Sequence, residues 1–305
     1  MKILIFLLTA YLYADLPYHH NAICYGPFRD GQEPGKNNPT NHQLKEDLEI
    51  ISKNWSSIRM YGSRGSTEKV LEIISKENIN LKLYMGAWIA NEASDSNAIY
   101  QNKMELNKTI ELANKYPNII EAVIIGNETQ VFWTWNKVKF ETLRKYIKFV
   151  KSNISQPIST ADDFNFWNKP EGIELAKELD FIMVHIHPLW AGTLINDALP
   201  FVEKIYNEIS LIHPNKQLVI GETGWATSVH TEGEQAKLIK GKAGITEQLI
   251  FYKSMTSWSQ NKNVLTFFFE AFDEKWKGGD HPNEVEKHWG LFYSDRSPKH
   301  RFKNE

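Results

Sequence analysis

Two segments decide the fold of this chain: AVIIGNE at residues 122–128 and LVIGETGW at residues 218–225. Each begins as a short apolar run, Ala122–Ile125 in one and Leu218–Ile220 in the other, which predicts a buried strand. Each then places one glutamate, Glu128 or Glu222, where the strand runs out. Two carboxylates on well-separated strands of one α/β chain are what acid/base hydrolysis of a glycosidic bond requires.

Similar runs recur along the chain and alternate with helical patterns. The eight predicted strands are Ala22–Phe28, Ser57–Tyr61, Leu81–Trp88, Ala122–Gly126, Pro157–Ala161, Phe181–His185, Leu218–Glu222 and Val264–Phe269. Apolar residues at helical spacing predict helices over Asn41–Asn54, Thr67–Asn78, Asn97–Tyr116, Lys137–Asn153, Gly172–Leu179, Asp197–Ile212 and Glu234–Gln260. Eight βα units predict a single (β/α)8 TIM barrel of the α/β class. No Pro/Gly/Ser linker or repeat divides it, so residues 15–305 are expected to form one catalytic domain.

Composition narrows the class of partner. The formal net charge of −2 gives no electrostatic footprint for nucleic acid or an anionic membrane, so a neutral substrate is favoured. Met1-Lys2 followed by a short apolar run predicts a signal peptide over residues 1–14, and hence a secreted or periplasmic protein with no stable membrane span. Cys24 is the only cysteine, so no intrachain disulfide can form. We expect a monomer.

The predicted strand ends are rich in polar side chains. In a barrel of this kind the active site forms at the carboxyl ends of the strands. The residues expected there are Tyr25, Arg29, Asp30, Arg59, Tyr61, Asn127, Glu128, Asp162, Asp163, His185, His187, Glu222, Glu270, Asp273 and Glu274. Their bias toward one end of the barrel predicts a site at that end.

Several short motifs, taken in order, resemble glycoside hydrolase family 17, the β-1,3-glucanase family. They are Cys24-Tyr25-Gly26, Ile58-Arg59-Met60-Tyr61, Gly126-Asn127-Glu128, Ser159-Thr160, Gly221-Glu222-Thr223-Gly224-Trp225, Phe272-Asp273-Glu274-Lys275-Trp276-Lys277 and Trp289-Gly290-Leu291-Phe292. The stretch YGPFRDGQ at residues 25–32 is more similar to the bacterial branch of that family than to the plant branch. The loops at Thr129–Asn136 and Leu189–Thr193 depart from the plant pattern.

The resemblance implies a retaining mechanism in which Glu128 is the acid/base and Glu222 the nucleophile. Asn127 would hydrogen-bond the sugar 2-hydroxyl, and Arg59 would help to keep Glu222 ionised. Further candidates for substrate binding or support, each of which could instead have a structural role, are Tyr25, Tyr61, His185, His187, Trp225, Glu270, Glu274, Lys277 and Glu286.

Tryptophans favour a sugar cleft, since a flat indole ring matches the apolar face of a pyranose. Seven lie at or after predicted strand ends: Trp88, Trp133, Trp135, Trp167, Trp190, Trp225 and Trp276. Trp55 and Trp258 lie in helical stretches and are expected in the core. Because strand side chains alternate between two faces, we expect His185 and His187 to diverge and not to bind a metal together. We expect no cofactor.

The leading functional hypothesis is an endo-β-1,3-glucanase that acts on laminarin or laminari-oligosaccharides. A β-1,3-glucanosyltransferase could use the same residues, with a sugar in place of water as acceptor. Two further hypotheses are a mannanase or mixed-linkage glucanase and a catalytically silent glucan-binding barrel. Arg59-Met60-Tyr61 and Glu222-Thr223-Gly224-Trp225 argue against the mannanase and mixed-linkage glucanase.

Overall fold

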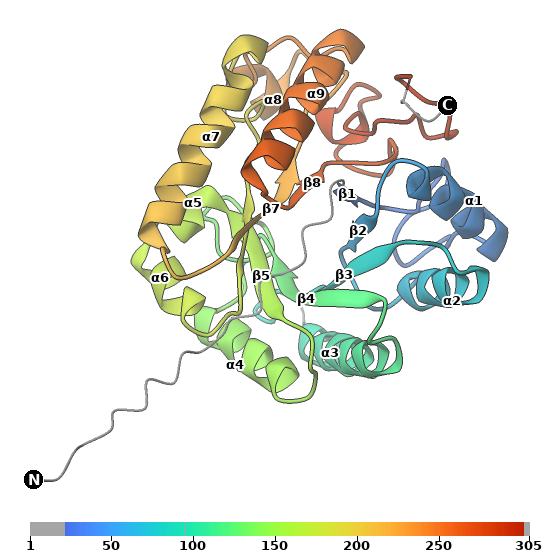
Figure 1. Ribbon diagram of the computed structural model, residues 1–305, viewed down its shortest axis with the longest axis vertical. Helices are drawn as coiled ribbons and strands as arrows, with labels where there is room; N and C mark the ends of the chain where they lie inside the picture. Colours follow the sequence, from blue (N-terminus) through green and yellow to red (C-terminus); the bar gives the residue numbers. More distant parts are fainter. Residues whose placement is uncertain (1–21, 95, 302–305) are drawn as a thin grey trace, which may run out of the picture.

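Eight parallel strands close into one barrel in the order β1 to β8, as the computed structural model shows (Figure 1). The structure describes residues 22–94 and 96–301, so the predicted signal peptide lies outside the described residues. The strands are β1 (Ala22–Cys24), β2 (Ser57–Met60), β3 (Lys82–Ala87), β4 (Ile120–Asn127), β5 (Ile158–Asp163), β6 (Ile182–His185), β7 (Leu218–Thr223) and β8 (Thr266–Phe268). The (β/α)8 barrel predicted from the sequence is confirmed.

Helices surround the barrel on its outside (Figure 1). They are α1 (Asn41–Ser52), α2 (Thr67–Glu77), α3 (Ala98–Lys115), α4 (Phe140–Lys151), α5 (Phe164–Trp167), α6 (Pro170–Ala176), α7 (Ile195–Ile212), α8 (Gly233–Leu238) and α9 (Ile245–Lys262), with a 3-10 turn η1 at Val285–Lys287. The apolar runs that predicted strands, such as Val123–Ile125, are fully buried between the helices and the barrel interior. Trp55 and Trp258 are buried, as expected.

One predicted helix is wrong. The span Glu234–Gln260 is not continuous, because α8 ends at Leu238 and α9 begins at Ile245. Gly241 lies between them, against the carbonyl of Thr193 and the indole of Trp225, where an added Cβ would approach to 2.5–2.8 Å. The chain leaves the helical path at Ile239, whose ψ is 121°, and Gly241 then passes through this contact. The short helix α5 was not predicted.

The segment after β8 covers one side of the barrel beside α1 and α9 (Figure 1). Arg296 in this segment donates to Asp47 of α1 at 2.7 and 2.8 Å, and Arg29 donates to the same carboxylate at 2.8 Å. The Tyr25 hydroxyl, at the end of the first strand, donates to Asp47 as well, at 3.1 Å. Asp47 thus fastens three parts of the chain to one another.

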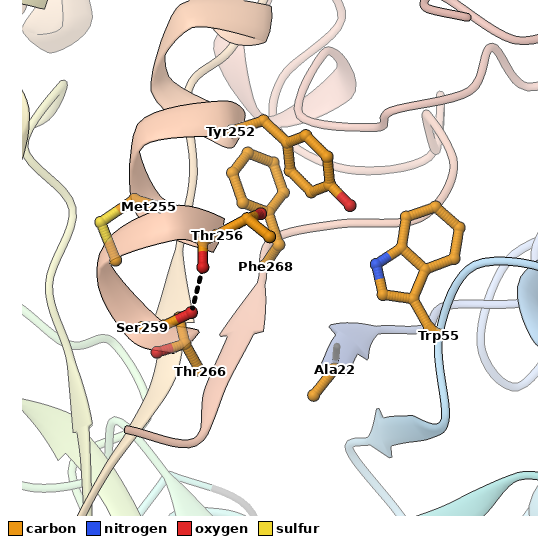
Figure 2. A pocket seen from close by; sticks show the side chains of 8 residues that line it. All are labelled: Ala22, Trp55, Tyr252, Met255, Thr256, Ser259, Thr266 and Phe268. Carbon is orange, nitrogen blue, oxygen red and sulfur yellow. Dashed lines mark hydrogen bonds between the residues drawn. The ribbon is translucent and has the colours of Figure 1, made fainter. Parts of the chain in front are cut away.

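A small pocket lies between α9 and the beginnings of β1 and β8 (Figure 2). Its lining residues are Ala22, Trp55, Tyr252, Met255, Thr256, Ser259, Thr266 and Phe268. None of them belongs to the predicted site, so this pocket is separate from the strand ends that carry the glutamates. Among the described residues, no helix is long and apolar enough to cross a membrane.

Candidate active site

Glu222, within β7, is a nearly buried carboxylate with three hydrogen-bond partners at its oxygens. Arg59 Nη1 and the Tyr61 hydroxyl each donate to Oε1 at 2.9 Å. His187 Nε2 lies 3.2 Å from Oε2. Both Glu222 oxygens are therefore held in fixed positions by side chains from other strands and loops.

These partners decide the charge of Glu222. Burial alone would raise its pKa, but His185, the hydrogen bond with His187 and the Arg59 guanidinium together hold that pKa well below its usual range. Glu222 is thus ionised at any ordinary pH. The hydrogen bond to Glu222 has the opposite effect on His187, whose pKa is raised although burial alone would lower it.

Glu128 sits directly after β4 in an unusual backbone conformation. Its φ is +47°, in the left-handed region, and Gly126 two residues before it has a φ of +81°. The pairing of β4 with β5 shifts register between Ile124 and Asn127, and Glu128 N then donates to Ala161 O at 2.8 Å. This irregular strand end places the Glu128 side chain at the barrel mouth, where it remains one-third exposed.

One imidazole ring connects the two glutamates. His185 Nδ1 lies 2.9 Å from Glu128 Oε1, while Nε2 lies 2.9 Å from Arg59 Nη1 and 3.4 Å from Glu222 Oε1. An arginine nitrogen can only donate, so in the neutral ring Nε2 accepts and the proton on Nδ1 is donated to Glu128. The carboxylates of β4 and β7 therefore face the same space, as the sequence predicts.

The expectation that His185 and His187 diverge was wrong. Residues two positions apart on a strand share a face, and both rings lie within 3.4 Å of a Glu222 oxygen. Both histidines approach the carboxylate of Glu222. Among the residues that the structure describes, no group of three or more His, Cys, Asp or Glu side chains is placed to hold a metal ion.

Asn127 is oriented by the same arginine. Arg59 Nη2 donates to Asn127 Oδ1 at 2.6 Å, so the amide nitrogen of Asn127 is left to donate elsewhere. Arg59 Nη1 also donates to the Gly221 carbonyl at 2.8 Å. A single buried guanidinium thus fixes residues of β4, β6 and β7 relative to one another.

A second polar group lies beyond β8. Lys277 Nζ contacts Glu270 Oε2 at 2.6 Å and Glu274 Oε2 at 2.8 Å, and all three side chains are largely buried. Burial raises the pKa of Glu270 well above its usual value, against the pull of Lys277. Burial also raises the pKa of Glu286, which accepts from the Trp190 indole at 3.1 Å. Lys277 and His187 act against burial at Glu286 and lower that pKa.

Two predicted site residues face away from the cleft. Tyr25 is buried and its hydroxyl is used by Asp47, so its role is structural. Trp225 is fully buried, with its indole donating to the Lys242 carbonyl at 3.0 Å, and it cannot stack on a sugar. Trp167 is buried as well, whereas Trp88, Trp133, Trp135 and Trp276 are exposed.

Asp162 is identified from the sequence only as a strand-end residue. In the structure its carboxylate accepts from Gln130 N at 2.8 Å and from Asp163 N at 3.0 Å, and it anchors the loop that follows Glu128. Burial raises its pKa well above the usual value, and the charge of Glu128 acts in the same direction. Two acidic residues in succession at a strand end were the only sequence signal of this role.

Fold and site together define a class: a (β/α)8 barrel whose two glutamates at the ends of β4 and β7 contact the same imidazole, the arrangement of a glycosidase. The sequence model of the BtgE/BtgC glycoside hydrolase domain matches residues 22–290, and the chain belongs to this family.

Individual relatives agree with this assignment. A putative glucan endo-1,3-beta-glucosidase, btgC, of Aspergillus niger is 32% identical over 281 residues, which are 86% of this chain and 40% of that protein. The chain thus spans about two fifths of the length of this relative. The crystal structure of an endo-laminarinase from Formosa Hel1_33_131 superposes with a TM-score of 0.78 at 25% identity, covering 91% of this chain and 85% of that one. A glycoside hydrolase family 17 beta-1,3-glucanosyltransferase from Rhizomucor miehei shares the fold, with a TM-score of 0.73 at 23% identity over 93% and 97% of the two chains.

Proposed function

We propose that this chain is a retaining endo-β-1,3-glucanase in which Glu128 is the acid/base and Glu222 the nucleophile. The observation that carries the proposal is the contrast between the two carboxylates on either side of His185. Glu222 is buried, ionised and held by Arg59, Tyr61 and His187. Glu128 is one-third exposed and contacts only the imidazole among these groups. Different surroundings for two carboxylates are what separate acid and nucleophile roles.

The chemistry proceeds in two steps. In the first, a Glu222 oxygen attacks the anomeric carbon while Glu128 transfers its proton to the leaving glycosidic oxygen, so that the C–O bond breaks and a glycosyl ester forms. In the second, Glu128 takes a proton from water, whose oxygen displaces Glu222 from the same carbon. His185 donates to Glu128 Oε1, which leaves Oε2 to carry the transferred proton.

Asn127 supports both steps in this proposal. Its amide nitrogen, left available by the Arg59 contact, can donate to the hydroxyl next to the anomeric carbon. Such a contact strengthens as positive charge develops on the sugar. In the polar group beyond β8, Glu270 and Glu274 hold Lys277, and Lys277 and Glu286 would orient further hydroxyls.

The substrate is proposed from the relatives. The Aspergillus protein is named as an endo-1,3-beta-glucosidase, and the Formosa structure is of an endo-laminarinase. We therefore propose β-1,3-glucan and laminari-oligosaccharides as substrates. A product screen on laminarin, curdlan, lichenan, cellulose and mannan tests this directly. Release of reducing ends from laminarin and curdlan is expected, and release from mannan or cellulose alone would contradict it.

A β-1,3-glucanosyltransferase would use the same two glutamates, and the Rhizomucor enzyme with this fold is named as one. The two activities differ in whether water or a sugar hydroxyl accepts the glycosyl group. Incubation with laminari-oligosaccharides followed by sizing of the products separates them. Products longer than the starting sugar would establish transfer, and shorter products alone would establish hydrolysis.

We also propose that residues 1–14 are a signal peptide and that residues 15–305 act as one catalytic domain, which is secreted or periplasmic. We propose further that this domain is a monomer and belongs to the bacterial branch of family 17. The signal peptide is supported by the basic start followed by a short apolar run, and the bacterial branch by the stretch YGPFRDGQ at residues 25–32. Mass spectrometry of the exported protein should find a mature N-terminus near Asp15. An intact Met1 would contradict the proposal.

A further inference from the structure

Three large aromatic side chains are exposed in the loop between β4 and α4. Phe132 is 87% exposed, Trp133 50% and Trp135 81%. Their neighbours Val131 and Val138 are buried in the same loop. The loop therefore keeps its small apolar side chains inside and presents its largest ones to solvent, the reverse of what burial of apolar area favours.

Backbone and side-chain hydrogen bonds hold this loop in place. Val138 N donates to Thr129 O at 3.2 Å, and Gln130 Nε2 donates to Val138 O at 3.0 Å, which closes the base of the loop. Gln130 N donates to the buried Asp162 carboxylate at 2.8 Å. The aromatic rings thus project from a loop that hydrogen bonds hold in place, so the loop loses little conformational entropy when the rings bind a ligand.

The loop after β4 is also hydrogen-bonded to the loop after β3. Asn136 is buried, donates to Ile89 O at 2.8 Å and accepts from Asn91 N at 2.8 Å. Trp88, directly before Ile89, is partly exposed as well. These contacts place the loops after β3 and β4 side by side at the mouth of the barrel, next to the strand end that carries Glu128.

The segment that carries these rings, residues 129–138, contains no carboxylate. Lys137 is the single charged residue of segment 129–138, and its ammonium donates to the carbonyls of Gln130 and Val131. Phe132 meets Trp133 edge to face, with ring centroids 4.7 Å apart, so that one ring supports the other. A neutral ligand with apolar faces fits this surface better than an anionic one.

We propose that Trp133 and Trp135 form a binding surface for the glucan chain beyond the sugars held at the two glutamates. This inference rests on the proposed function, because it takes the same substrate. The apolar CH faces of successive glucose rings would stack on the two indoles, with Phe132 supporting Trp133. The surface is continuous with the site through the loop that starts at Glu128, so a long chain could contact both.

The test compares long and short substrates in the Trp133→Ala/Trp135→Ala variant. Binding to insoluble curdlan, measured by depletion at low temperature, should weaken by about fivefold to a hundredfold, since two stacking contacts are lost. The kcat/KM for a short aryl β-laminarioside should change less than twofold. Trp133→Phe/Trp135→Phe should recover most of the binding. Phe149→Ala, which removes an exposed aromatic from α4, serves as the control and should leave both measurements unchanged.

Several results would overturn the inference. Unchanged curdlan binding in the double alanine variant would do so, as would an equal loss on the short substrate, which would place the rings within the catalytic subsites. Binding of the wild type to neutral phosphatidylcholine vesicles, lost in the double variant while curdlan binding is kept, would assign the rings to a membrane instead. A wild type that binds curdlan through these tryptophans but cleaves no β-glucan would contradict the proposed function alone and leave the surface standing.

Discussion

Replacement of Tyr61 by Phe removes one defined contact from the proposed nucleophile. The Tyr61 hydroxyl donates to Glu222 Oε1 at 2.9 Å, in a buried setting. A hydrogen bond to a charged group contributes about 1.5–3 kcal/mol, and about 1.4 kcal/mol corresponds to a factor of ten. Because Phe keeps the ring, the change is confined to the hydroxyl group, whose other side-chain hydrogen bond is with the buried Cys24 thiol.

Two effects are expected in Tyr61→Phe. The kcat/KM for an aryl β-laminarioside should fall by about tenfold to a hundredfold, since the oxygen that attacks is less well positioned. Loss of a donor to the ionised form also raises the pKa of Glu222, so the acid limb that Glu222 sets, which lies below ordinary pH in the wild type, should move up toward that range. The measurement is the pH dependence of initial rates together with the melting temperature.

Tyr84 provides a matched control. Its hydroxyl is buried inside the barrel and has no hydrogen-bond partner among the described residues, so Tyr84→Phe removes a buried phenol oxygen without breaking a contact. We expect unchanged kcat/KM and equal or higher stability in that variant. If Tyr61→Phe matched Tyr84→Phe in both rate and pH profile, the assignment of Tyr61 as a donor to the nucleophile would be refuted.

Three further predictions concern stability. In Gly26→Ala the new Cβ would approach the Glu274 carboxylate to 2.2–2.5 Å, so thermal unfolding should show a loss of about 1–3 kcal/mol, whereas Gly279→Ala, which meets nothing within 4 Å, should be near neutral. Lys277→Met leaves two buried carboxylates without their cation, and denaturant unfolding should show a loss of about 3–5 kcal/mol at neutral pH that shrinks as lower pH neutralises them. Burial lowers the pKa of His300 to about 4, so the unfolded chain binds more protons than the folded chain, and stability falls as pH drops from about 6.5 to about 4. His300→Gln should flatten this part of the stability profile. An unchanged slope would contradict the reasoning.

The barrel was predictable because apolar runs and helical patterns alternate along the whole chain, and each predicted strand lies where the structure has one. Strand lengths were less predictable. The first strand ends at Cys24 and not at Phe28, because Tyr25 turns toward Asp47 of α1. The break between α8 and α9 depends on a contact of Gly241 with distant residues, which a local pattern does not reveal.

The site was predictable in its strand ends and less so in its contacts. The positions of Glu128, Glu222, Arg59 and Asn127 follow from the strand pattern, since parallel strands end at one face of the barrel. The burial of Trp225 does not follow from the strand pattern, because the side chain of a residue directly after a strand can turn inward or outward. The link through His185 lies beside register shifts near the ends of β4 and β6, which the sequence does not encode in any recognisable motif.

The central claim, that Glu222 is the nucleophile and Glu128 the acid/base, is tested most directly by azide rescue. The aryl β-laminarioside is supplied to Glu128→Ala and to Glu222→Ala in the presence of azide, and the anomeric configuration of the glycosyl azide is read by NMR. Glu128→Ala should still form the glycosyl ester with a good leaving group, and azide should then yield the β-azide. Glu222→Ala should yield the α-azide by direct displacement. The reverse pair of anomers would exchange the two roles, and no rescue in either variant would contradict the two-carboxylate mechanism.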